Sequence, residues 1–194
     1  MAAFVRSADR LSLWVGHAFA WCILILTLGV CYEVFVRYAL RAPTGWSYDL
    51  SYMMYGALFL MGGAYTLSRD GHVRGDVLYR LWPPRVQAAV DGVLYVLFLL
   101  PAAGALVYAG WLHASQSWRF KEVSVFSPAG VPVYPMKTLI PIAGALLFLQ
   151  GIAEILRCAQ CLRSGTWPRR LHDVEELETQ IVSQVHTGSQ GAGR

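Results

Sequence analysis

Four long windows without a charged side chain are the feature that most constrains this chain. They cover residues 11–32, 50–68, 92–118 and 138–153 of 194. A helix that crosses the hydrocarbon core of a membrane needs about 20 apolar residues. Three windows reach that length, and the fourth does so if Lys137 and Glu154 extend their charged ends toward the two membrane surfaces. The windows therefore predict an all-α integral membrane protein.

We predict four transmembrane helices in a membrane domain over residues 1–160. Their expected bounds are about 11–38, 46–68, 86–117 and 134–156. A soluble protein with four buried helices is disfavoured, because the segments outside the windows are too short to cover them. Pro101 is expected to kink or rearrange the third span. Residues 161–194 are predicted to form a cytoplasmic tail, partly helical and then disordered.

The positions of Lys and Arg predict how the spans are oriented, because cytoplasmic flanks carry an excess of these residues. With both termini inside, ten Lys or Arg side chains flank the spans on the cytoplasmic side and five on the outer side. We therefore expect both termini in the cytoplasm. These flanks also explain the sequence pI near 9.0, so the lipid bilayer is the expected partner and nucleic acid is not.

Two polar segments connect the spans. Residues 66–81, "TLSRDGHVRGDVLYRL", combine alternating charges with apolar residues at helical spacing, so they predict a short amphipathic helix in the membrane interface between spans two and three. Residues 118–134 contain Pro128, Pro132 and several aromatic residues, and Pro135 follows directly, so they predict an ordered extracytoplasmic loop.

Several charged residues are expected near the outer surface. Glu33 and Arg37 are four residues apart, with the acid first, which favours a helical ion pair. Asp49 lies about one turn into span two, where it would either reach water or contact a partner or Arg37. Glu122 and Lys137 are candidates for buried charges, with solvated loop charges as the alternative.

The sequence lacks the motifs of common enzymes and cofactor-binding proteins. No nucleotide-binding glycine pattern, zinc-protease motif or nucleophile elbow is present. A haem would need two facing His ligands at one depth, but His17 and His113 are expected in opposite leaflets. Cys158 and Cys161 form a C-x-x-C motif without other ligands at the same depth. We therefore expect no catalysis, no metal and no cofactor.

A transporter that acts alone is also disfavoured. Its path would need broken helices or charged groups near the middle of the membrane. Here the charges lie at the ends of the expected spans, and Pro101 is the strong helix breaker in the middle of one. The residues thus predict an accessory or scaffold subunit of a larger complex. The alternative is a membrane anchor or cytochrome-like redox subunit of another inner-membrane complex.

Two sequence blocks, in this order and with four spans, resemble a known family. The blocks are "GAYTLSRDGHVRGDVL" at 63–78 and "VPVYPMKTLIPIAGALLFLQG" at 131–151. Over about residues 10–160 the chain resembles the small membrane subunit (DctQ-like) of tripartite ATP-independent periplasmic (TRAP) transporters. The resemblance implies a non-enzymatic scaffold in the bacterial inner membrane.

The resemblance also implies the partners. A large DctM-like membrane subunit would carry the transport path and the sodium sites. A periplasmic DctP-like binding protein would deliver an organic acid or related solute, and an ion gradient would drive uptake. The substrate is not encoded in this chain, because specificity would lie in those two partners.

The resemblance marks ten positions as candidates for subunit contacts or anchoring. They are Arg37, Trp46, Asp49, Arg69, His72, Arg74, Asp76, Glu122, Pro135 and Lys137. Asp49 stands where the family usually has Glu, and Gly75 stands where an apolar residue is usual. Separately, the aromatic and proline-fixed outer loop suggests Arg119 and Lys121 as contacts for the binding protein.

Overall fold

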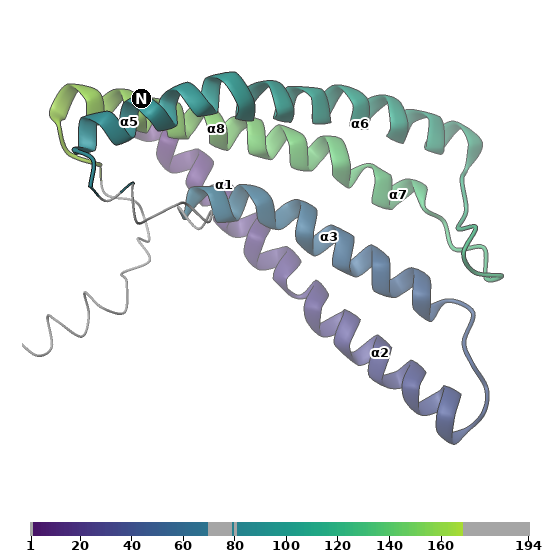
Figure 1. Cartoon of the computed structure of the whole chain (residues 1–194). Helices are drawn as coiled ribbons and strands as arrows, with labels where there is room; N and C mark the ends of the chain where they lie inside the picture. The colour runs from purple at the N-terminus through teal and green to yellow at the C-terminus, as the bar shows by residue number, and fades with distance from the viewer. Residues whose placement is uncertain (1, 70–78, 80, 169–194) are drawn as a thin grey trace, which may run out of the picture.

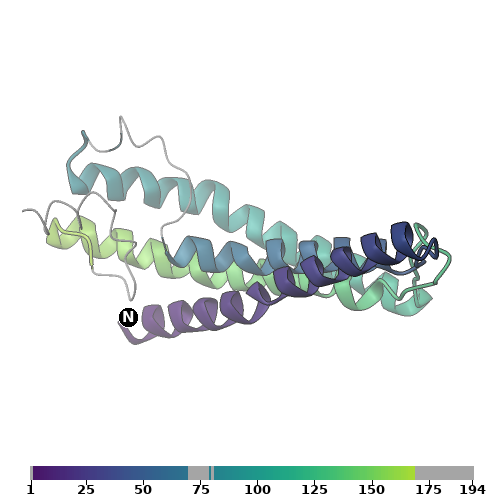
Figure 2. The same ribbon diagram turned by 90° about the horizontal axis from the view of Figure 1, so that it is seen from below.

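The computed structural model describes residues 2–69, 79 and 81–168. These residues form an elongated bundle of helices (Figures 1 and 2). The connections α2–α3 and α6–α7 lie at one end of it, called the loop end here. The start of α1 and the last turns of α8 lie at the other end, called the terminus end. Most of the predicted interfacial helix and most of the predicted cytoplasmic tail lie outside the described residues.

The first expected span, about 11–38, lies within a longer helical stretch. Helices α1 (Ala2–Ala20) and α2 (Cys22–Ala39) are separated only by Trp21, where the chain keeps helical dihedral angles but the helix is interrupted. The stretch Ala3–Ala39 has 37 residues and contains a segment apolar enough to cross a membrane. At 1.5 Å per residue that length is about 55 Å, well above a hydrocarbon thickness of about 30 Å. The stretch must therefore tilt or extend beyond the membrane core.

The third span is rearranged next to Pro101, as the sequence predicts. Helices α5 (Pro84–Leu94) and α6 (Leu100–Phe120) are joined by a five-residue π-helix, η1 (Tyr95–Leu99). Proline has no N–H to donate, and its ring clashes with the carbonyl four residues earlier. The wider π-turn immediately before Pro101 relieves both problems without ending the helix.

Helix α8 (Leu139–Ser164), which follows the single turn α7 (Tyr134–Lys137), packs against α1, α3, α5 and α6. Its contact with α6 relies on small residues. A Cβ atom added to Gly144 would lie 3.0 Å from the Val107 backbone nitrogen, and one added to Gly110 would lie 3.0 Å from the Pro141 nitrogen. Small residues at both positions let the backbones of α6 and α8 approach closely, as in other membrane bundles.

Three helical stretches of the described chain are long and apolar enough to span a membrane: Ala3–Ala39, Pro84–Phe120 and Tyr134–Ser164. Helix α3 (Ser47–Ser68) has 22 residues and is not among these three stretches; it carries Asp49 and several tyrosines and serines. It packs between α1, α2 and α8. The described residues thus form an all-helical fold with three candidate spans, and a fourth span over 46–68 stays a prediction.

The α6–α8 contact can be tested at its glycines. Gly144→Ala is expected to lower the free energy of unfolding by about 1–3 kcal/mol, because its Cβ would press on the α6 backbone, which cannot move aside like a side-chain end. Thermal unfolding of the purified chain in detergent measures the effect. The matched control is Gly63→Ala in α3, where an added Cβ would meet no neighbouring atom within 4 Å. Equal effects of the two substitutions would contradict the packing argument.

Candidate functional site

At the loop end, the carboxylate of Glu33 ties α2 to the connection that follows it. The Arg37 side chain donates two hydrogen bonds to Glu33 Oε1, at 2.9 Å from Nε and 2.6 Å from Nη2. Thr44 donates to Oε2 through its backbone nitrogen at 3.2 Å and through its hydroxyl. The helical pair expected from the sequence is therefore present, and it also fixes residues 40–46 against the end of α2.

Asp49 anchors the outer loop, residues 121–133, to the first turn of α3. Its side chain accepts hydrogen bonds from Ser124 Oγ at 2.5 Å and from the Ser127 hydroxyl, and the residue is 0% exposed. The helix N-terminus further favours the negative charge. The expectations that Asp49 reaches water or contacts Arg37 are wrong, because two serines satisfy it and Arg37 binds Glu33.

The outer loop is itself a small closed hairpin. Ser124 N donates to Val131 O at 2.8 Å, and Val133 N donates to Glu122 O at 3.0 Å. Lys137 Nζ lies 2.5 Å from Glu122 Oε2, so α7 closes the base of the hairpin. The hydrogen bond from Lys137 holds the pKa of Glu122 below its ordinary value. These two charges are thus paired with each other, with Lys137 mostly buried and Glu122 exposed.

Aromatic rings fix the same end. Trp46 precedes α3 and stacks on Tyr32 of α2, with 6.1 Å between the ring centroids. Trp118 at the end of α6 contacts Tyr134 at the start of α7, at 4.5 Å. Pro135 sits in the first turn of α7, where its fixed φ suits a helix start. The loop end is therefore held by ion pairs, serine hydroxyls and ring contacts together.

The three carboxylates of the loop end are all used inside the protein, whereas three cations are not. Glu33, Asp49 and Glu122 have the partners given above. Arg41, Arg119 and Lys121 are exposed, and none of them takes part in an ion pair within the described part of the chain. The surface that this end offers to another molecule is therefore basic.

At the terminus end, a buried polar network joins α1 to α8. Arg157 donates through Nη1 to Glu154 Oε1 and through Nη2 to Asp9 Oδ2. Gln150 Nε2 donates to Asp9 Oδ1 at 2.9 Å, and Ser12 Oγ donates to Gln150 Oε1 at 3.0 Å. Gln150, Glu154 and Arg157 are 0%, 1% and 3% exposed. This network crosses 148 residues of sequence and fixes the register of α1 along α8.

The sequence reasoning missed this network. Glu154 was expected to extend toward the membrane surface, but it turns inward because Arg157 offers a buried cation one turn away. The spacing of Gln150, Glu154 and Arg157 by four and three residues places them on one face of a helix, which is a signal for a shared partner. Asp9 faces them from a helix whose apolar run gives no such signal.

Among the residues that the structure describes, no three His, Cys, Asp or Glu side chains converge as a metal site would require. His17 Nδ1 lies 2.8 Å from Leu13 O, and its ring meets Tyr65 edge-on. Cys158 and Cys161 are buried, where they pack with Ala88 between α5 and α8. Each of these residues has a packing role in the bundle.

Comparison with known proteins decides the family. The family described as "Tripartite ATP-independent periplasmic transporters, DctQ component" matches residues 26–161, which is most of the chain. The chain belongs to the DctQ family. The resemblance drawn from the two sequence blocks is confirmed, and the match favours a transporter subunit over a redox subunit.

A curated relative points in the same direction. The DctQ-family chain is 21% identical over 147 residues to the sialic acid TRAP transporter small permease protein SiaQ of Vibrio cholerae serotype O1. The alignment covers 76% of this chain and 82% of the relative. This protein is therefore a transmembrane TRAP transporter small permease by family. The contacts of Glu33 and Asp49 at the loop end lie inside the matched residues, whereas Asp9 lies before them.

The candidate contact residues divide into two groups. Seven of the ten lie in the described part of the chain: Arg37, Trp46, Asp49, Arg69, Glu122, Pro135 and Lys137. Six of these gather at the loop end, and Arg69 ends α3 at the other end, with its guanidinium carbon 5.3 Å from the centre of the Tyr65 ring. His72, Arg74 and Asp76 lie outside the described residues. All ten remain candidates for contacts with other subunits.

The terminus-end network can be tested through Arg157. Arg157→Ala leaves the carboxylates of Asp9 and Glu154 buried without this guanidinium, so it is expected to destabilise the protein by about 3–5 kcal/mol. Thermal unfolding in detergent, together with proteolysis of α1, measures the loss. Arg163→Ala removes an exposed arginine from the same helix and is the control. If both variants unfold like the wild type, the network does not hold α1.

Proposed function

We propose that this chain is the small subunit of a TRAP transporter that scaffolds a large DctM-like subunit. The carrying observation is that every charged side chain of the described helices lies toward one of the bundle's two ends. A polar solute would find no partner along the middle of the helices. The transport path is therefore assigned to the large subunit, and this chain supports it.

The outer surface of the bundle supports a scaffold role. Helix α2 exposes large apolar side chains along most of its length, and α3 exposes the stacked pair Tyr55 and Phe59. A Cβ atom added to Gly62 or Gly63 of α3 would meet no neighbouring atom within 4 Å, so a helix of another subunit can approach α3 closely there. The large subunit covers this face, and lipid covers the remainder.

The proposed arrangement places both termini in the cytoplasm of a bacterial cell and the loop end in the periplasm, with α3 as a fourth span. The excess of Lys and Arg in the segments predicted to be cytoplasmic supports this orientation. The transporter takes up an organic acid or related solute with a sodium gradient. The sialic acid in the relative's name belongs to that relative.

The loop end then docks the periplasmic binding protein. Asp49 and the Glu122–Lys137 pair hold the outer loop in one conformation, so little entropy is lost on binding. Arg119 and Lys121, both exposed, would face acidic groups on the binding protein. Opposite charges across the contact accelerate encounter and fix its register.

Reconstitution tests the scaffold proposal. Liposomes that contain the large subunit and this chain are expected to take up solute when the binding protein and an inward sodium gradient are both present. Radiolabelled solute measures the rate. Omitting this chain is expected to abolish uptake, because the large subunit loses its support in the membrane. Full sodium-driven uptake by the large subunit alone would contradict a required scaffold.

Charge reversal tests the docking surface. The double substitution Arg119→Glu and Lys121→Glu is expected to raise, on the order of tenfold, the binding-protein concentration that gives half-maximal uptake, since two attractive contacts become repulsive. Uptake at saturating binding protein should change little. Arg163→Glu at the terminus end is the control with the same kind of charge change. An unchanged concentration dependence would place the docking site elsewhere.

A further inference from the structure

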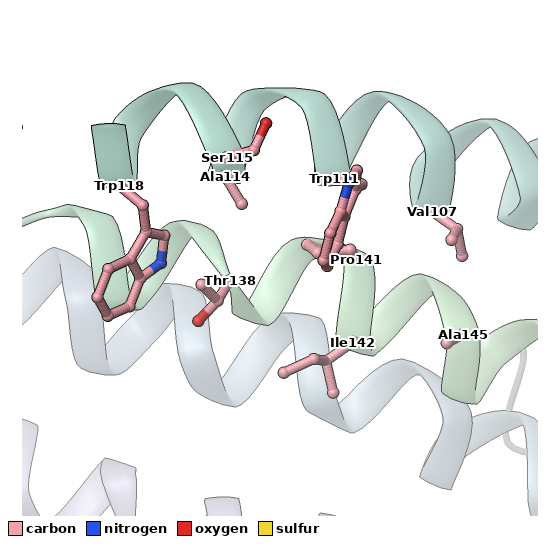
Figure 3. Close-up of a pocket in the computed structure, with 9 residues that line it drawn as sticks. All are labelled: Val107, Trp111, Ala114, Ser115, Trp118, Thr138, Pro141, Ile142 and Ala145. Carbon is pink, nitrogen blue, oxygen red and sulfur yellow. The ribbon is translucent and has the colours of Figure 1, made fainter. Parts of the chain in front are cut away.

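An open apolar groove runs between α6 and α8 in the half of the bundle next to the loop end (Figure 3). Its cavity volume is about 640 Å³, inside the range of roughly 300–1,000 Å³ common for ligand sites. Trp111 and Trp118 extend from α6 toward α8, with Ala114 between them (Figure 3). Pro141 and Ala145 of α8 form part of the opposite wall.

The groove exists because the two helices are close while their side chains are small. Gly110 and Gly144 bring the backbones together, as described above. On the outward side of this contact, Ala114 and Ala145 leave the space that larger residues would fill. The two tryptophans then wall the space without closing it, since Trp111 is 68% exposed.

The hydroxyl groups that line the groove already donate their hydrogen bonds within the protein. Ser115 Oγ already donates to Leu112 O at 2.9 Å, and Thr138 Oγ1 donates to Pro135 O at 2.5 Å. Both hydroxyls are therefore satisfied locally, within three residues along the chain. Apart from the indole N–H groups of Trp111 and Trp118, the other lining side chains are hydrocarbon, so the groove suits a hydrocarbon chain. Both helices belong to stretches apolar enough to lie in a membrane.

The polarity changes in order toward the loop end. The groove ends at the contact between Trp118 and Tyr134, and such aromatic residues favour the level of lipid headgroups. Directly after Trp118 come Arg119, in the last turn of α6, and Lys121, its exposed C-cap. The groove is thus followed by an aromatic pair and then by two cations, neither of which has an ion pair in the described chain. This order matches a hydrocarbon chain that carries a phosphate.

We propose that this groove binds one glycerophospholipid of the leaflet next to the loop end. One acyl chain lies along Ala114 and Ala145, and the phosphate meets Arg119 and Lys121. These two side chains carry five and three N–H donors, so a phosphate leaves donors for the binding protein. A helix of a partner subunit would also fill the apolar part of the groove. It would give no reason for the two cations that follow Trp118 in the chain. The site does not depend on the proposed function, because it needs only the membrane and this chain.

Native mass spectrometry of the full chain in a mild detergent, titrated with phosphatidylglycerol, tests the site. The wild type is expected to bind one lipid at saturation. Ala145→Phe places a ring in the groove from an exposed position, so it should weaken binding on the order of tenfold, because each buried methylene contributes roughly fourfold in affinity. Ala145→Leu should give a smaller loss and keeps the test valid if the Phe variant fails to fold.

The matched control is Ala109→Phe, an exposed alanine of α6 outside the groove, which should bind like the wild type. Arg119→Gln with Lys121→Gln should weaken binding while the groove stays intact. Equal affinities of the Ala145→Phe and Ala109→Phe variants would overturn the proposal. A second result would also overturn it. If the purified complex with the large subunit contains no lipid, and if changing Ala145 prevents its assembly, a helix of the large subunit is the occupant.

Discussion

The contact on which the bundle depends is the close packing of α8 against its neighbours. Inside a membrane there is little hydrophobic force between helices, so they associate through tight van der Waals contact and buried polar groups. Helix α8 uses both means on different faces. Gly144 lets α6 approach along one face, and Gln150, Glu154 and Arg157 bind α1 on another. Removing this helix would leave α1, α5 and α6 without their common partner.

Buried charged groups have different structural roles at the two ends of the bundle. At the terminus end, the network closes on itself between two helices and fixes how they align. At the loop end, the carboxylates of Glu33 and Asp49 bind connecting segments rather than other helices. The first arrangement stabilises the bundle, and the second shapes a surface. The proposed role is to support the large subunit and to dock the binding protein. It requires both a stable bundle and one ordered, exposed end.

The sequence predicted what depends on local pattern. Uncharged windows located the apolar helices, the four-residue spacing predicted the Glu33–Arg37 pair, and Pro101 predicted a rearranged third helix. It could not predict contacts between distant segments. Ser124 lies 75 residues from Asp49, and nothing near either residue indicates the pairing. The break at Trp21 was also missed, because no proline or glycine stands there and helical propensity alone gives no reason for it.

Helix α2 is stabilised more by the membrane around it than by contacts with the rest of the protein. Of its 18 residues, only Glu33 and Val36 are buried in this fully described helix. In water, a helix of that length with so few contacts would be marginal, whereas in hydrocarbon an unpaired backbone amide is too costly to form. The membrane is thus a structural component of this segment. The fold is therefore complete only in a membrane, where lipid or the proposed large subunit surrounds the exposed apolar side chains of α2.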